Sequence, residues 1–194
     1  MLAIVIPYYK FTFFETTLKS LASQTDKRFK VYIGDDASIK NPKDLLDKYK
    51  EEIDYKYFRF DNNLGGESLV SQWDRCISKI GDEQWIMILG DDDYLSNNCI
   101  EEFYKNINEV ENLDIKVVRF ATREVYETGN ISKLFNHPKI DKSTDFFFRK
   151  FFRGSRGSLS EQIFKREAYN KHGFRNFPLG WGTDDFAWLD FTEF

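Results

Sequence analysis

The chain has 194 residues, of which 41% are hydrophobic, so it can form one domain with a proper core but not two large ones. The net charge of −4 excludes the basic surplus typical of nucleic-acid-binding proteins. No apolar run approaches the ~18 residues of a transmembrane helix, and the first ten residues lack the basic start and cleavage site of a signal peptide. We therefore expect a cytoplasmic domain without nucleic-acid partners.

Apolar runs and helical patterns alternate along residues 1–122. The continuous apolar run at residues 2–8 is typical of a strand buried on both faces. The expected strands are residues 2–8, 29–36, 55–60, 84–90 and 115–121, with helical spacing of apolar residues between them. This alternation predicts an α/β fold with a mostly parallel central sheet flanked by helices on both faces.

Two of the expected helices carry recognisable start signals. Thr12 to Glu15 fits a capping box, and Asn41 followed by Pro42 fits a cap with proline in the first turn. The local sequence therefore predicts helix starts at these two points.

Residues 123–194 form a less regular half of what we expect to be one domain over residues 1–194. A hairpin is expected around residues 128–130, and a short strand and a helix closed by Gly173 after residue 160. In "FFFRKFF", residues 146–152, the sequence favours aromatic side chains in the core and basic ones in water. The alternative is contact with a membrane surface. His137 and His172 are expected at the surface.

Three expected strands end in chemically notable residues. Strand 2–8 ends at Pro7 and Tyr8, strand 29–36 ends in two acids, and residues 91–93 are three acids in a row. Ligands of such sheets bind outside the carboxyl ends of the strands, so these groups should meet at one crevice. Clustered carboxylates repel one another unless a cation lies among them, and their oxygens suit magnesium or manganese. The alternative for residues 91–93 is a solvated turn that caps the next helix, and the alternative for Asp35 and Asp36 is a simple turn.

Five motifs in chain order carry a family resemblance. They are "IVIPYY", "VYIGDDAS", "NNLGG…QWDRCI", "WIMILGDDDYL" and "GTDDFAWL". In this order they resemble family 2 inverting glycosyltransferases. The resemblance implies the Rossmann-like GT-A fold, with residues 1–122 as the nucleotide-sugar-binding half and residues 123–194 as the acceptor side.

The resemblance assigns roles to residues of the donor site. Asp36 matches the carboxylate that accepts a hydrogen bond from the uracil imide, and Asp91 matches one near the ribose. Asp92 and Asp93 match the metal-binding part of a DxD motif, which implies Mn²⁺ or Mg²⁺. The remaining donor-binding residues implied by the resemblance are Pro7, Tyr8, Tyr9, Asn63, Gly65 and Gly66.

"GTDDF" resembles the catalytic element of the family, with Asp184 in its Glu position and Asp185 in the position of the general base. Asp184 and Trp181 would lie on the acceptor side. A carboxylate base is needed because an acceptor hydroxyl is a poor nucleophile until it loses its proton. A plain helix start is the alternative, since acids favour first turns.

The resemblance implies transfer of a sugar from a nucleotide sugar, expected to be a UDP-sugar, to a saccharide or lipid-linked saccharide. Peripheral contact with the inner face of the membrane fits such an acceptor. A binding module without catalysis and a sugar nucleotidyltransferase are the rival functions. The latter is disfavoured because "PYYKFTFF" has no glycine-rich phosphate loop. The chain stops nine residues after Asp185, which we expect of a truncated or a short family member.

Overall fold

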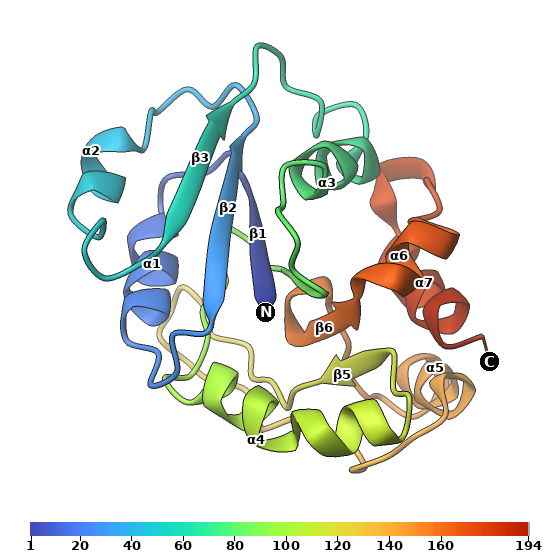
Figure 1. Ribbon diagram of the computed structural model, residues 1–194. Coiled ribbons are helices and arrows are strands. Elements are labelled where there is room, and N and C mark those ends of the chain that lie inside the picture. The colour runs from blue at the N-terminus through green and yellow to red at the C-terminus, as the bar shows by residue number, and fades with distance from the viewer. Residues whose placement is uncertain (194) are drawn as a thin grey trace.

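The centre of the molecule is a six-stranded sheet (Figure 1), in a computed structural model that describes residues 1–193. Its order is β3-β2-β1-β4-β6-β5, and β1 to β4 are parallel. The strands are β1 (Leu2–Tyr8), β2 (Phe29–Asp35), β3 (Tyr55–Arg59), β4 (Trp85–Ile88), β5 (Val117–Arg119) and β6 (Gln162–Lys165). The predicted α/β fold with a mostly parallel sheet is confirmed.

The register of β1 brings three chain segments to one edge of the sheet. Tyr8 pairs with Asp35 at the end of β2, and Val5 pairs with Ile88 at the end of β4. The ladder continues one step beyond β4, because the Leu89 amide donates to the Val5 carbonyl at 2.9 Å. The residues that follow these strands therefore share one edge, as the sequence predicted.

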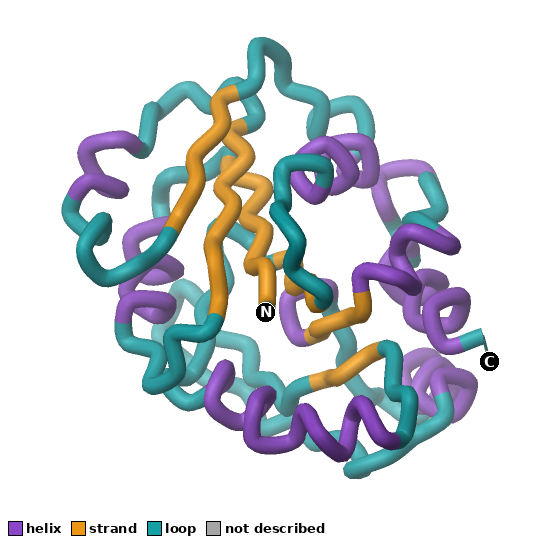
Figure 2. Tube along the Cα trace, viewed as in Figure 1, coloured by secondary structure: helices purple, strands orange, loops and turns teal. Residues whose placement is uncertain are grey.

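Helices cover both faces of the sheet (Figure 2). Along β1 the side chains alternate, so that Leu2 and Ile4 join one core and Ala3 and Val5 the other. This alternation explains the unbroken apolar run of β1. The first core includes α1 (Phe14–Ala22), α2 (Lys43–Asp47) and α4 (Cys99–Asn112), and the second includes α3 (Leu69–Ile77), α5 (Ser143–Phe152), α6 (Arg166–His172) and α7 (Thr183–Thr192).

The two predicted helix starts differ from the structure. Helix α1 begins at Phe14 without a side-chain cap, so the capping box from Thr12 is wrong. A backbone turn, in which the Phe14 amide donates to the Phe11 carbonyl at 3.2 Å, precedes the helix instead. In α2, Pro42 is itself the cap residue, and Asn41 accepts a hydrogen bond from the Lys43 amide at 3.0 Å.

Strand β6 enters the sheet between β4 and β5 and runs antiparallel to both. Strand β5, the last strand of residues 1–122, is therefore separated from β4 by β6, which belongs to the second half of the chain. A short 3-10 turn, η1 (Leu159–Glu161), leads into β6, and it follows the end of α5 by a glycine-containing loop. This insertion brings residues 159–161 to the same edge as the ends of β1 and β4.

The second half holds the other predicted features. Two antiparallel bridges, Thr122 with Phe135 and Val125 with Ile131, form a hairpin around residues 128–130. Gly173 closes α6 with φ of 63°, a left-handed value that suits glycine. A second 3-10 turn, η2 (Pro178–Gly180), precedes α7. No helix within residues 1–193 has the length and apolarity needed to cross a bilayer.

Candidate active site

A cavity of about 380 Å³ lies at the carboxyl edge of β1, β2 and β4. It collects most of the donor-site residues expected from the sequence. Its lining is Pro7, Tyr9, Lys10, Asp36, Asn63, Gly65, Gly66, Leu69, Gln72, Trp73, Ile88, Gly90, Asp91, Leu159 and Ser160. Residues from five separated segments thus converge, as expected of a ligand site at the strand ends of an α/β sheet.

Asp91 joins the ends of two strands at this cavity. Its carboxylate accepts the backbone amides of Tyr9 at 2.7 Å and Lys10 at 2.6 Å. Burial raises the pKa of Asp91, and the two backbone hydrogen bonds oppose that rise. The Asp91 carboxylate therefore fixes the loop after β1 against the loop after β4, and its second oxygen accepts none of the hydrogen bonds among the described residues.

Asp92 and Asp93 belong to the loop after β4, directly after Asp91, and are exposed. Both carboxylates approach Gly90, where a Cβ would lie 2.8 Å from an Asp93 oxygen and 3.1 Å from an Asp92 oxygen. Within residues 1–193, no cluster of three or more acidic, His or Cys side chains could hold a metal alone. Neither residue lines the cavity, but Gly90 beside them does. Two hard oxygen donors next to Gly90 fit Mg²⁺ or Mn²⁺ whose other ligands would come from a diphosphate and water.

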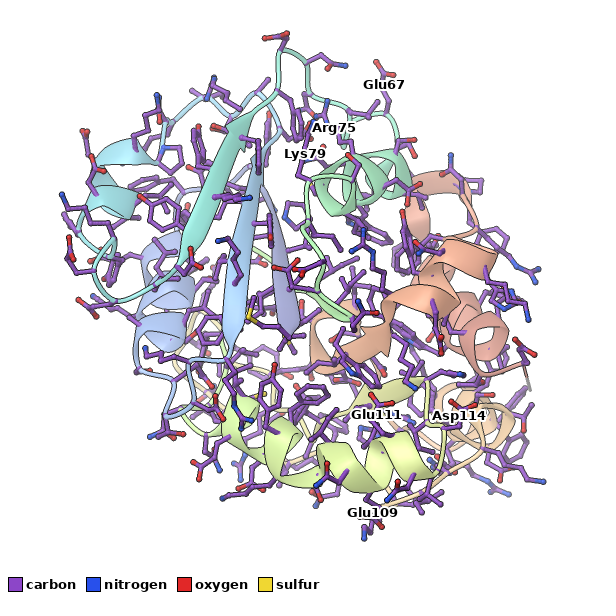
Figure 3. All side chains as sticks on the ribbon, in the orientation of Figure 1. Glu67, Arg75, Lys79, Glu109, Glu111 and Asp114 are labelled. Carbon is purple, nitrogen blue, oxygen red and sulfur yellow. The ribbon has the colours of Figure 1, made fainter. Side chains whose placement is uncertain are left out.

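Asp36 binds the turn that follows β3. One carboxylate oxygen accepts the Leu64 amide at 2.7 Å, and the other accepts the Gly65 amide at 2.8 Å. The Arg75 guanidinium, which extends from α3 toward this turn (Figure 3), also forms an ion pair with Asp36. Gly65 is required by close approach, since a Cβ there would lie 2.6 Å from the carboxylate.

The preceding acid, Asp35, faces away from the cavity. It is fully buried and accepts hydrogen bonds from the Ser38 amide, the Tyr57 hydroxyl and the Arg59 guanidinium. Of the two acids at the end of β2, only Asp36 therefore lines the cavity.

Trp73, which was not among the predicted site residues, and Tyr8, which was, have different positions. Trp73 lines the cavity and packs on Phe174, with ring centroids 5.5 Å apart. Tyr8 does not line it: the side chain is buried against Phe14, and its hydroxyl donates to the Lys40 carbonyl at 2.7 Å. The side chain of Tyr8 thus joins α1 to the loop after β2 from within the core.

The "GTDDF" segment lies outside the cavity lining, at the start of α7. Gly180 of the preceding η2 turn packs against Leu69, which lines the cavity, so the two regions are neighbours. Asp185 is buried and forms an ion pair with Lys150 of α5. Burial raises the pKa of Asp184, the Asp185 charge adds to that rise, and the Lys150 ammonium opposes it. Trp181 is 79% exposed.

Sequence reasoning missed several residues of the cavity. Lys10 directly follows the predicted "PYY", so the reasoning that assigned Tyr9 to the site could have included it. Ser160 was not, because its hydroxyl meets the Gly90 amide at 3.0 Å across 70 positions of the chain. Leu159 reaches the cavity by the same insertion of η1 and β6 beside β4.

Helix α5 has the reverse of its expected polarity. Arg149 and Lys150 point inward to ion pairs with Asp141 and Asp185. Three phenylalanines of the helix face outward instead, with exposed fractions of 49% for Phe148, 53% for Phe151 and 69% for Phe152. Among the aromatic side chains of "FFFRKFF" only Phe146 is fully in the core, so the prediction of a buried aromatic face with solvated basic groups is wrong. The buried carboxylates of Asp141 and Asp185 explain the reversal, since each needs a cation.

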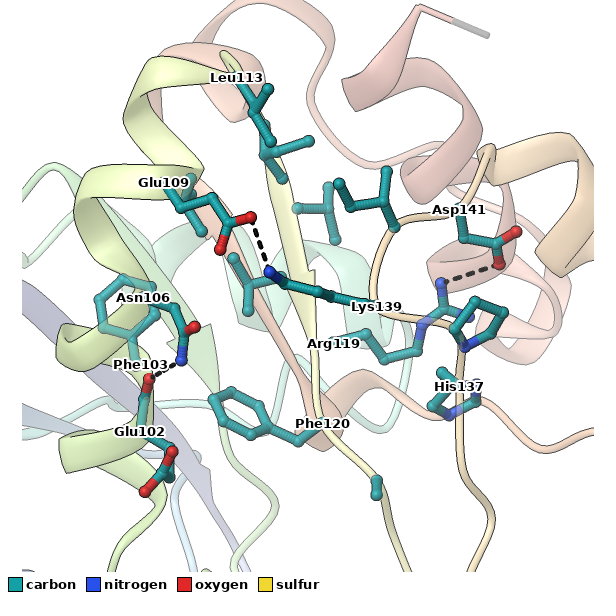
Figure 4. A pocket seen from close by; sticks show the side chains of 17 residues that line it. Glu102, Phe103, Asn106, Glu109, Leu113, Arg119, Phe120, His137, Lys139 and Asp141 are labelled. Carbon is teal, nitrogen blue, oxygen red and sulfur yellow. Dashed lines mark hydrogen bonds and ion pairs between the residues drawn. The ribbon is translucent and has the colours of Figure 1, made fainter.

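A second cavity, of about 360 Å³, lies between α4, β5 and residues 137–141 (Figure 4). Lys139 pairs with Glu109 across it at 2.7 Å. None of the predicted donor, acceptor or metal residues lines it. His137, which lines this cavity, has a side chain that is only 5% exposed, so the prediction of a surface position is wrong for this histidine.

Comparison with known proteins decides the family. The model of the family described as "Glycosyl transferase family 2" matches residues 3–173. The chain belongs to glycosyl transferase family 2. The GT-A fold expected from the sequence and the identity as a glycosyltransferase are therefore confirmed.

Solved structures of glycosyltransferases share the fold of this family 2 chain. S. aureus TarS 1-349 with UDP superposes with a TM-score of 0.71 at 18% identity, covering 97% of this chain and 55% of that one. The same protein with UDP-GlcNAc superposes with a TM-score of 0.73 at 16% identity, covering 97% of this chain and 52% of that one. The mannosyltransferase PcManGT from Pyrobaculum calidifontis, with GDP-Man and Mn²⁺, gives 0.62 at 13% identity, with coverage of 95% and 49%.

The family 2 chain thus spans about half the length of these structures. No curated protein matches it.

Proposed function

We propose that this family 2 chain transfers a sugar from a UDP-sugar to a saccharide or lipid-linked saccharide, with inversion at the anomeric carbon. The observation that carries the proposal is the convergence of Asp36, the Asn63–Gly66 turn and Asp91 on one cavity, with the Asp92 and Asp93 carboxylates close to Gly90, which lines it. TarS, which shares the fold, was solved with UDP and with UDP-GlcNAc, and this supports the choice of nucleotide.

The uracil-binding role proposed for Asp36 depends on its remaining acceptor capacity. A carboxylate offers about four lone-pair sites. The amides of Leu64 and Gly65 and the Arg75 guanidinium occupy three of them. One position on the oxygen beside Gly65 is left for the imide N–H of uracil. Guanine could use the same oxygen only with a larger ring system in the cavity, so GDP is the competing nucleotide to test.

Asp92 and Asp93 are proposed to hold Mg²⁺ or Mn²⁺ together with the donor diphosphate. A bound divalent cation supplies Lewis-acid stabilisation of the departing diphosphate. Lys10, which lines the cavity, adds a second positive charge near the same phosphates. Asp91 is already bound to the backbone of Tyr9 and Lys10, so its proposed role is to shape the ribose side of the cavity.

Asp185 is proposed as the general base. Its carboxylate takes the proton of the acceptor hydroxyl while the acceptor oxygen bonds to the anomeric carbon and the bond from that carbon to the diphosphate oxygen breaks. One in-line displacement inverts the anomeric configuration. Asp185 is held by Lys150, so this ion pair has to loosen when the acceptor binds. Asp184 and Trp181 at the same helix start are proposed to contact the acceptor.

The outward aromatic face of α5 supports a place for the protein at the inner surface of a membrane. We define this face as Phe148, Phe151 and Phe152. Arg153 stacks over Phe148, with 5.6 Å from its Cζ to the ring centroid, and forms no ion pair within residues 1–193. An exposed apolar group with an unpaired cation fits an anionic bilayer interface, although Asp145 is also exposed on this helix. Such contact would present lipid-linked acceptors to the neighbouring start of α7.

The experiment that tests the proposal measures UDP release from a panel of UDP-sugars with Mn²⁺, with and without saccharide acceptors. Acceptor-dependent release supports the transferase. Tight UDP binding without any release supports the rival function, a binding module that has lost catalysis.

A further inference from the structure

Two acids stand side by side in the first turn of α7, and the proposed reaction needs only one of them as its base. The Asp185 side chain is 6% exposed, and Asp184 is partly buried. Neighbouring carboxylates away from water repel each other, so such a pair tends to keep one proton unless a cation offsets one of the charges. The position of the nearest cation therefore decides which of the two acids is ionised.

Lys150 is that cation, and it is bound to one acid only. Its ammonium forms an ion pair and a hydrogen bond with Asp185 Oδ1, and it forms neither with Asp184 within residues 1–193. Aromatic packing lies beside this ion pair, because Phe147, one turn before Lys150, meets Phe186, next to Asp185, with ring centroids 5.9 Å apart. The Lys150 side chain is 20% exposed, so water screens its charge only in part.

The other charged groups on the elements that pack against α7 have partners of their own. These ion pairs are Arg175–Asp190, Lys171–Glu193 and His172–Glu193 around α6 and α7, and Arg119–Asp141, Arg149–Asp141 and Arg156–Glu161 around β5 and α5. Burial and the Asp185 charge raise the pKa of Asp184 and outweigh the lowering by Lys150. Asp184 is thus the member of the pair that keeps a proton longer.

The hold of Lys150 on Asp185 leaves one carboxylate oxygen open. Asp185 Oδ2 accepts none of the hydrogen bonds within residues 1–193, and it is not among the buried atoms that lack a partner. This oxygen is therefore accessible from solvent, while Oδ1 is held by the ammonium.

We propose that Lys150 is a positioning residue for the base: its ammonium keeps Asp185, rather than Asp184, as the ionised acid and leaves Asp185 Oδ2 for the acceptor proton. The ion pair loosens as Oδ2 gains that proton, because the charge of Asp185 is then lost. This inference rests on the proposed role of Asp185 as base.

The test compares Lys150→Met, which removes the charge, with Lys150→Arg, which keeps it. Lys142→Met is the matched control, because Lys142 at the start of α5 is exposed and forms no ion pair within residues 1–193. UDP release from UDP-GlcNAc with a saccharide acceptor is measured between pH 5 and 9. In Lys150→Met the acid-side loss of rate should set in about one to three pH units higher than in the parent, since a neighbouring cation favours an ionised carboxylate by that much.

Lys150→Arg and the Lys142→Met control should keep the parental pH profile and the parental UDP affinity. An equal loss of rate at every pH in Lys150→Met would show that Lys150 only supports the packing of α5 on α7. A parental profile in Lys150→Met would show that Lys150 does not act on the base. Either result overturns the proposal.

A second measurement separates this inference from the proposed function. The carboxyl ¹³C signal of Asp185 is titrated by NMR, which needs no turnover, and in Lys150→Met it should titrate at a higher pH than in the parent. If it does so but no UDP-sugar is turned over, the effect of Lys150 on Asp185 stands and the proposed function fails. If Asp185 titrates at the same pH in both proteins, the inference is wrong whatever the activity.

Discussion

Arg75 and Asp36 form an ion pair at the wall of the cavity, and the Arg75 guanidinium also stacks over Phe60, 4.0 Å from the ring centroid to Cζ. Asp36 thereby links α3 to the end of β2 and to the turn after β3. The carboxylate that we propose to bind the nucleobase is the same one that fixes the turn after β3, which we propose to lie beside the diphosphate. In this proposal, base recognition and the shape of the donor site depend on the same side chain.

Replacement of Asp36 should therefore weaken nucleotide binding strongly. Asp36→Ala leaves the Leu64 and Gly65 amides and Arg75 without their acceptor, at roughly 1–3 kcal/mol for each buried unsatisfied group. We expect UDP affinity to fall at least about tenfold, equal to about 1.4 kcal/mol. Calorimetry with UDP and with GDP measures these affinities. The control is Asp61→Ala, which changes an exposed acid in the turn after β3. Unchanged UDP affinity, or equal affinity of the parent for GDP, would contradict the assignment.

The metal role of Asp92 and Asp93 predicts that Mn²⁺ strengthens UDP binding. Two exposed carboxylates bind a cation weakly alone, and phosphate oxygens complete its shell. UDP affinity should therefore fall in chelator, and Asp92→Asn with Asp93→Asn should remove the difference between chelator and Mn²⁺. Asp145→Asn, which changes an exposed acid on α5, is the control. The metal role is wrong if parental UDP affinity is the same in both conditions.

Glu161, which ends η1 and is buried, should make the stability of the protein depend on pH. Its pKa is raised from 4.5 to about 7 in the folded state, so the folded protein binds more protons between these values. The contribution of Glu161 to the free energy of unfolding is thus present below pH 4.5 and lost as pH rises to about 7. Glu161→Gln should raise the melting temperature relative to the parent more at pH 8 than at pH 5. Equal shifts at both pH values would show that Glu161 titrates normally.

The pKa shift of His137 has the opposite direction to that of Glu161, so its effect on stability changes with pH in the opposite sense. Single variants are needed to separate the two effects. Its pKa falls from 6.5 to about 4, so its contribution is complete above pH 6.5 and is lost as pH falls to about 4. The two effects oppose one another between pH 4.5 and 6.5. His137→Gln should remove the destabilisation at acid pH that Glu161→Gln leaves in place.

The sequence predicted the part of the site that depends on parallel strands. Apolar runs identify β1, β2 and β4, and parallel pairing forces Tyr9, Asp36 and Asp91 to one edge. The sequence did not predict the part of the site that depends on the pairing of strands far apart in the chain. Ser160 reaches Gly90 only because the four-residue β6 enters between β4 and β5.

The polarity of α5 was predicted wrongly for a related reason. Helical spacing shows which residues share a face, but the choice of the inner face depends on buried partners elsewhere. Asp141 and Asp185 select the face with Arg149 and Lys150. Short-range patterns do not contain that information.

The aromatic face of α5 predicts membrane binding. Replacing Phe148, Phe151 and Phe152 together by serine should leave the melting temperature nearly unchanged, because these side chains are exposed. Sedimentation with phosphatidylglycerol vesicles should decrease severalfold. Ile39→Ser, at a side chain that is 96% exposed away from this face, is the control. If the parent does not sediment with vesicles, or if the triple variant only dissociates a dimer, the membrane contact is wrong.

The central claim is that Asp185 is the base of an inverting transfer, and the rate of sugar transfer by Asp185→Asn tests it most directly. Asp190→Asn is the matched control on the same helix, since Asp190 is also ion-paired, with Arg175 at 2.7 Å. We predict that Asp185→Asn keeps parental UDP and Mn²⁺ binding and loses ~10² or more of its transfer rate, because a base acts in the transition state. Transfer by Asp185→Asn at the parental rate would contradict the account.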